Sequence, residues 1–140
     1  MRSLKQFLWR WLPPVVWMGL IFLLSAQPDL PQAPGPWLDT VLKKAAHTLA
    51  FGLLAWLYLR ALRQHFDRLA VLRLVSAGLA LLYAISDEYH QTFVPGRQGR
   101  LLDVAVDSAG ICGAILLDWW LARRQRSRQP TPPARQPLAR

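Results

Sequence analysis

Hydrophobic residues in this chain gather into four blocks that contain no charge, at residues 15–24, 49–59, 74–85 and 111–117. A soluble amphipathic helix would place polar residues every three or four positions, so this blocking is typical of membrane-spanning helices. Each block is shorter than the ~20 residues that cross a hydrocarbon core, so each span must include flanking polar residues. We predict an all-α polytopic membrane bundle of four transmembrane helices, at residues 8–26, 45–62, 69–91 and 102–121.

The basic residues predict how this bundle is oriented. The chain has 140 residues, 17 lysines and arginines and a net charge of +9. Thirteen of the 17 lie before or at the start of the first predicted helix, at or near the connection between the second and third, or after the fourth: Arg2, Lys5, Arg10, Arg60, Arg63, Arg68, Arg73, Arg123, Arg124, Arg126, Arg128, Arg135 and Arg140. Cytoplasmic flanks retain lysine and arginine during insertion. The pattern therefore predicts that both termini are cytoplasmic and that residues 27–44 and 92–100 lie outside.

Composition divides the chain into a four-helix membrane domain at residues 1–122 and a tail at residues 123–140. The tail mixes arginine, glutamine and proline without apolar periodicity. Such a composition predicts a disordered cytoplasmic segment that lies against anionic lipid headgroups. The tail has no interleaved aromatic residues, so we expect membrane lipids and no nucleic acid as its partners.

Ionisable residues gather at the outer ends of the last three predicted helices and in the loop between the third and fourth. Helical spacing of three or four puts neighbours on one face, as for Asp87 with Gln91 or Asp103 with Asp107. Such groups are costly near a bilayer unless they are paired, and they are commonly functional. Two interpretations follow: a satisfied network that fixes helix packing, or a polar pocket open to the outer face, which we favour. The candidate site residues are Lys44, His47, Asp87, Glu88, His90, Gln91, Arg97, Arg100, Asp103 and Asp107.

The loop VPGRQGR at residues 94–100 strengthens the pocket interpretation. Pro95 and Gly96 suit a tight turn, and two arginines follow whose guanidinium groups suit phosphate or carboxylate. The alternative interpretation is that these arginines only neutralise neighbouring carboxylates. On the fourth predicted helix, Gly110 and Ala114 would let another helix approach closely. The sequence leaves open whether that helix belongs to the same chain or to a second copy in a homo-oligomer.

These motifs resemble the VanZ-like family of small bacterial membrane proteins. The resemblance rests on a serine that ends the first span, on lysine and histidine spaced three apart before an aromatic residue, on D-E-x-x-Q, on an aromatic-x-P-x-R turn, and on an aspartate followed by two glycines. The matching residues are Ser25, Lys44, His47, Phe51, Asp87, Glu88, Gln91, Phe93, Pro95, Arg97, Asp103, Gly110 and Gly113. The chain departs from the family at Asp107, where an asparagine is usual. The resemblance implies a multi-pass protein of the bacterial inner membrane with a role in the cell envelope.

The founding member of that family is linked to low-level resistance to the glycopeptide teicoplanin, but the resemblance implies no reaction. We expect the pocket to bind an anionic, lipid-linked or glycopeptide ligand through Lys44, Arg97 and Arg100, and to modulate glycopeptide susceptibility. One alternative is a transferase or hydrolase acting on a phosphorylated lipid, with His90 or a carboxylate as general base. Another is a small proton-coupled transporter. The spacing of Asp103 and Asp107 could hold a divalent metal, but we predict no metal and no cofactor, and leave open whether the protein is an enzyme.

Overall fold

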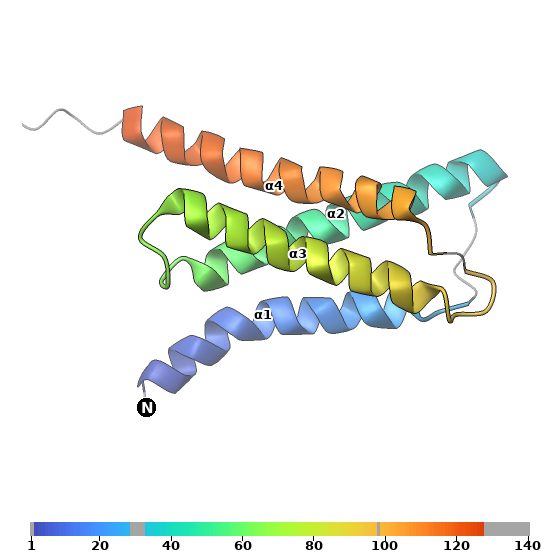
Figure 1. Cartoon of the computed structure of the whole chain (residues 1–140), viewed down its shortest axis with the longest axis horizontal. Helices are drawn as coiled ribbons and strands as arrows, with labels where there is room; N and C mark the ends of the chain where they lie inside the picture. Colours follow the sequence, from blue (N-terminus) through green and yellow to red (C-terminus); the bar gives the residue numbers. More distant parts are fainter. Residues whose placement is uncertain (1, 29–32, 98, 128–140) are drawn as a thin grey trace, which may run out of the picture.

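The computed structural model describes residues 2–28, 33–97 and 99–127, with side chains from residue 4 on. Over these residues the chain forms four α-helices: α1 (Arg2–Ser25), α2 (Pro36–Leu62), α3 (Leu69–Gln91) and α4 (Leu101–Ser127). The helices run alternately up and down, so the α1–α2 and α3–α4 connections lie at one end of the bundle (Figure 1). The α2–α3 connection and both described ends of the chain lie at the other. The predicted all-α bundle of four helices is confirmed.

Helix α3 has the predicted bounds, whereas the other three helices extend beyond the predicted spans. Helix α2 already begins at Pro36, whose fixed φ suits the first helical turn. Helix α4 continues through Ser127, so residues 123–127 are helical and not part of an irregular tail. Arginines stack on tryptophans four residues earlier in these last turns, with Arg123 lying 4.1 Å from the ring centroid of Trp119. The rest of the predicted tail lies outside the described residues.

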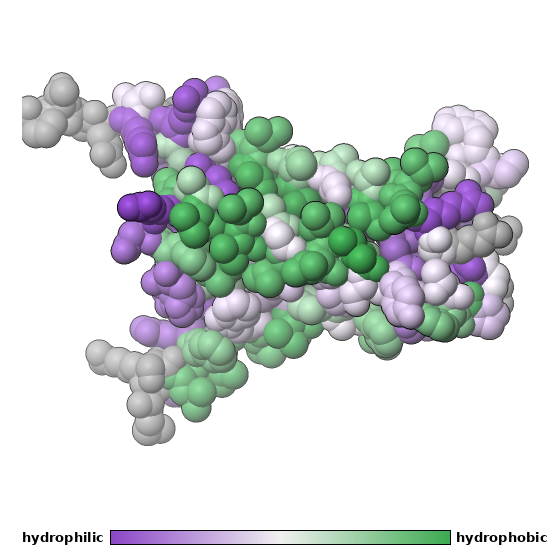
Figure 2. All heavy atoms as spheres, viewed as in Figure 1, coloured by the Kyte–Doolittle hydropathy of each residue, from purple (hydrophilic) through white to green (hydrophobic). Residues whose placement is uncertain are grey.

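Apolar side chains cover the middle of the bundle. Figure 2 shows this hydrophobic band, with hydrophilic residues at both ends of the molecule. Helices α1, from Leu4 on, α2 and α3 are each long and apolar enough to cross a membrane, so the chain is a multi-pass membrane protein. Helix α4 is not among these candidate spans. It carries three aspartates along its length, at Asp103, Asp107 and Asp118.

Helix α2 forms the centre of the bundle and supplies most of the core, including Phe51, Leu54 and Leu59. Helices α3 and α4 both pack against it, while α1 packs against α2 and α3. Side-chain hydrogen bonds fasten α1 to these neighbours; among them, the Trp17 indole donates to the carbonyl of Ala50, and the Tyr83 hydroxyl donates to the carbonyl of Met18. In α1 itself Pro13 and Pro14 remove two backbone donors, and the helix bends in this half (Figure 1).

Helices α2 and α4 approach so closely that their backbones touch at two glycines. A Cβ atom added to Gly52 would lie 3.0 Å from the carbonyl oxygen of Gly110, and one added to Gly110 would collide with the carbonyl oxygen of Thr48. The Thr48 hydroxyl in turn lies 3.3 Å from the carbonyl oxygen of Val106. The predicted role of Gly110 in close helix approach is confirmed, and the partner helix belongs to the same chain.

The α2–α3 end of the bundle is held by an ion-pair cluster that we did not predict. Asp118 of α4 is nearly buried and accepts from both Arg63 and Arg73, the latter at 2.8 Å. Two guanidinium groups thus neutralise one carboxylate at the point where three helices meet. At this end of α4 the cost of burying a charge is offset locally.

Candidate functional site

A cavity of about 490 Å³ opens at the α3–α4 end, between α2, α3 and α4. It brings together eight of the ten predicted site residues: Lys44, His47, Glu88, Gln91, Arg97, Arg100, Asp103 and Asp107. Its other lining residues are Pro28, Asp39, Thr40, Lys43, Gly96 and Val106. The cavity is polar and carries four basic and four acidic side chains besides one histidine.

Asp87 lies behind the cavity lining and supports it. This carboxylate is only 3% exposed, and its Oδ2 accepts from the Ser25 hydroxyl at 2.7 Å and from the Gln91 side chain at 3.0 Å. The serine that ends α1 is thereby tied to α3. Gln91 also lies 3.4 Å from Glu88 Oε1, so Asp87 helps to orient a residue of the lining through the amide between them.

His90 faces α1 and does not line the cavity. Its ring stacks on Phe22, with centroids 4.5 Å apart. Helical spacing places Asp87 near both His90 and Gln91, but only Gln91 turns toward the site. His90 therefore does not reach a ligand in this cavity, and the structure gives no support to its predicted role as general base there.

Arg97 lines the cavity and joins the α3–α4 connection to the end of α1. Its Nε and Nη2 atoms each donate at 3.1 Å, to the carbonyl oxygens of Gln27 and Leu24, and Nη1 lies 3.4 Å from Gln91 Oε1. Carbonyl groups at a helix C-terminus lack intrahelical donors and attract cations, which explains this placement. The sequence suggested carboxylates as the intramolecular partners of Arg97, but the structure shows two backbone carbonyls and the amide oxygen of Gln91.

Two lysine–aspartate pairs form the rim of the cavity. Lys44 of α2 lies 2.7 Å from Asp103 of α4, and Lys43 lies 2.6 Å from Asp39, one turn earlier on α2. The lysine side chains are 45% and 40% exposed, so both pairs are in contact with the surroundings. Asp39 was not a predicted site residue. The pattern could have revealed it, because aspartate four residues before lysine is a helical ion-pair signature, but only if α2 is known to begin at Pro36.

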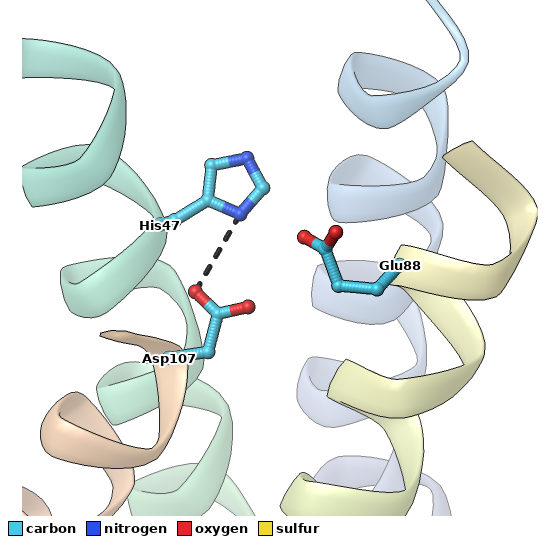
Figure 3. A group of neighbouring side chains, drawn as sticks. All are labelled: His47, Glu88 and Asp107. Atoms are coloured by element: carbon cyan, nitrogen blue, oxygen red, sulfur yellow. Dashed lines mark ion pairs between the residues drawn. The ribbon is translucent and has the colours of Figure 1, made fainter. Parts of the chain in front are cut away.

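Deeper in the cavity, His47, Glu88 and Asp107 converge from α2, α3 and α4 (Figure 3). One donor atom from each lies within 4.8 Å of the other two. Asp107 is fully buried, and His47 Nδ1 lies 3.6 Å from its Oδ1, which is longer than a hydrogen bond. Among the described residues neither oxygen of Asp107 has a hydrogen-bond partner. We call these three residues the inner triad.

The inner triad differs from the donor pair suggested by the sequence. Asp103 and Asp107 share a face of α4, but Asp103 is engaged by Lys44 at the rim whereas Asp107 points toward His47. Glu88 has its own supports, because Oε2 accepts from the backbone N–H of Arg100 at 3.0 Å and Oε1 is approached by Gln91. Two carboxylates and an imidazole in such an arrangement could hold a cation or move a proton.

The VanZ/LLP1 family model matches residues 10–122, a stretch that includes every residue of the cavity lining. No curated protein and no solved structure matches the chain.

Proposed function

The chain belongs to the VanZ/LLP1 family, and on this premise we propose that it binds the headgroup of an anionic, lipid-linked component of the bacterial envelope in the cavity at its α3–α4 end. The cavity carries the proposal, because four basic side chains line it directly beside the apolar band that faces lipid. A lipid whose chains lie against the helices would reach the cavity with its headgroup. Binding would change the exposure of that component and thereby modulate glycopeptide susceptibility, including that to teicoplanin.

This proposal includes a membrane topology. We propose that α4 is the fourth span and that the α3–α4 end faces outward from the bacterial inner membrane, with both termini in the cytoplasm. Its support is the positive-inside bias, since Arg60, Arg63, Arg68 and Arg73 lie at or near the α2–α3 connection at the opposite end. Pairing of Asp118 with two of these arginines lowers the cost of carrying this aspartate into a span.

Lys43 and Lys44 are the residues best placed to meet an incoming phosphate. Both ammonium groups are partly exposed at the rim and neighbour each other on α2, each held by a single aspartate. A phosphate oxygen can replace those partners with short charge-assisted hydrogen bonds. Arg97 is less free to change partners, because its guanidinium also holds α1.

The test is the amount of anionic lipid that stays bound to purified protein, measured by native mass spectrometry. A charge-assisted hydrogen bond contributes about 1.5–3 kcal/mol, so the double variant Lys43→Gln/Lys44→Gln should retain at least ~10-fold less. The control Lys5→Gln/Arg68→Gln also removes two exposed charges, from the opposite end, and should retain the wild-type amount. Equal lipid content in all three proteins, or equal loss in both variants, would refute the proposal.

A second candidate function is hydrolysis or group transfer on a phosphorylated lipid. Its specific support is the buried Asp107 beside His47, because a carboxylate next to an imidazole is the usual arrangement of a general base. His47 would take the proton of a water or hydroxyl that attacks phosphorus, as the bond to the leaving oxygen breaks. Phosphate release from a lipid phosphate should then be abolished in His47→Gln, and absence of release by the wild type would exclude this candidate.

A further inference from the structure

Asp107 is a buried carboxylate that the described residues leave unsatisfied. Its side chain is 0% exposed, both of its oxygens lack a hydrogen bond within the described residues, and it lines a polar cavity. Burying an acceptor without a partner destabilises the folded protein, and more so when the acceptor is charged. Native proteins rarely leave such a group unpaired unless something else satisfies it. The position of Asp107 therefore indicates an occupant that lies between it and the neighbouring side chains.

The inner triad has the spacing that a bound ion requires after small side-chain rotations. Donors about 2.1 Å from one ion lie roughly 3.0–3.4 Å from each other in octahedral or tetrahedral geometry. His47 Nδ1 and Asp107 Oδ1 are already 3.6 Å apart, and the donors of all three residues lie within 4.8 Å of one another. Glu88, which approaches from the opposite side in Figure 3, has the longest of the three side chains with which to shorten the remaining separations.

The charges of the triad also suit a divalent cation. Two carboxylates carry two negative charges when both are ionised, and a protonated His47 would compensate only one of them. Nearby ammonium groups are engaged elsewhere, since Lys44 pairs with Asp103 at 2.7 Å. A divalent ion would neutralise both carboxylates and satisfy the unpaired oxygens of Asp107. The hydrogen bonds from Gln91 and the Arg100 backbone to Glu88 are of the kind that orient a carboxylate ligand from outside.

We propose that His47, Glu88 and Asp107 bind one divalent transition-metal ion, with Zn²⁺ and Mn²⁺ the ions that their chemistry suits. An imidazole with two carboxylates combines the nitrogen donor preferred by Zn²⁺ with the oxygen donors preferred by Mn²⁺, and is a poor site for Mg²⁺. Three protein ligands leave coordination positions that face the cavity. The ion would occupy His47 Nδ1, so this site and the general-base role of His47 exclude each other.

Metal binding can be measured on the whole chain in detergent after treatment with a chelator. Mn²⁺ binding is followed by the loss of the electron paramagnetic resonance signal of the free ion, and Zn²⁺ and Mg²⁺ by competition. The wild type should bind one equivalent of Mn²⁺, which Zn²⁺ displaces at far lower concentration than Mg²⁺. Binding should weaken at least ~10-fold in Asp107→Asn, Glu88→Gln and His47→Gln, because each loses one direct ligand.

The controls are Asp39→Asn, which removes negative charge from the same cavity outside the triad, and Asp67→Asn, which removes an exposed charge from the opposite end; both should bind within about threefold of the wild type. Each variant is first checked for wild-type elution and helical circular dichroism. Should Asp107→Asn not fold, Glu88→Gln and His47→Gln decide, since Glu88→Gln retains an oxygen for the Arg100 N–H. Absence of binding by the wild type, unchanged binding in the triad variants, or equal loss in the controls overturns the proposal. No lipid enters this measurement, so its failure leaves the headgroup proposal standing.

Discussion

Replacing Gly110 by alanine should destabilise the bundle, whereas the same replacement at Gly113 should not. Both glycines lie on α4, one turn apart. A Cβ at Gly110 would collide with the carbonyl oxygen and carbon of Thr48, while a Cβ at Gly113 has nothing within 4 Å. Alanine should therefore force α2 and α4 apart in one variant and leave their packing intact in the other.

The size of the effect follows from two opposing contributions. Alanine stabilises a helix by about 1 kcal/mol relative to glycine, and this gain is common to both variants. Overpacking costs about 1–3 kcal/mol, and the upper value applies at Gly110 because a backbone carbonyl cannot rotate away as a side chain can. Gly110→Ala should thus lose ~2 kcal/mol and Gly113→Ala gain up to ~1 kcal/mol. The gap of ~3 kcal/mol corresponds to a Tm difference of roughly 6–12 °C.

The assay is thermal unfolding followed by circular dichroism at 222 nm, with wild type and both variants in the same detergent. The comparison between the two alanine variants cancels helix propensity and detergent effects. A Tm of Gly110→Ala equal to or above that of Gly113→Ala would refute the close contact between α2 and α4, and with it the geometry of the inner triad, because Asp107 lies one turn before Gly110 on the same helix.

Two further predictions concern buried polar groups at opposite ends of the bundle. Ser25→Ala removes the hydroxyl that donates to Asp87 and should lower the unfolding free energy by about 1–3 kcal/mol. The control Ser108→Ala loses only a hydrogen bond within α4, so its unfolding free energy should stay within ~0.5 kcal/mol of the wild type. Equal stability of the two variants would show that the Ser25 bond is not formed. Asp118→Asn should lower the unfolding free energy by ~3 kcal/mol, since it leaves two arginines without their carboxylate, and the exposed control Asp67→Asn should change it by less than ~0.5 kcal/mol. Denaturant titration in mixed micelles measures both pairs, and a wild-type value for Asp118→Asn would contradict the second prediction.

Hydrophobic blocks predict where helices cross a membrane but not where they end. Helix α3 has the predicted bounds because polar residues lie directly before and directly after its apolar block. Helices α2 and α4 run past their predicted spans because local pairs sustain them outside the apolar band. The Asp39–Lys43 ion pair supports the first turns of α2, and Arg123 on Trp119 supports the last turns of α4. Such pairs contribute little to a hydropathy pattern, so a prediction based on bilayer thickness stops short of them.

Helical spacing predicts which residues share a face, but not what that face meets. It places Asp87 with Gln91, and these two side chains do bond. The orientation of His90 depends on where α1 packs, and the spacing of residues within α3 carries no information about the position of α1. Arg97 donates to backbone carbonyls at the end of α1, and a prediction that considers only charged side chains cannot find such partners. Asp118 was overlooked because its arginine partners were interpreted only as indicators of topology.

Helix α4 buries one aspartate near each end of the bundle, and the contrast between them supports the proposed ion site at the α3–α4 end. Asp118 has two guanidinium partners in hydrogen-bonding contact. Asp107 is more deeply buried, yet His47, with which it pairs, is too distant for a hydrogen bond. A carboxylate that served packing only would be expected to acquire the same kind of partners, since Lys43, Lys44 and Arg97 all line the same cavity. These cations are engaged by other groups instead, which is the arrangement that the proposed ion site requires.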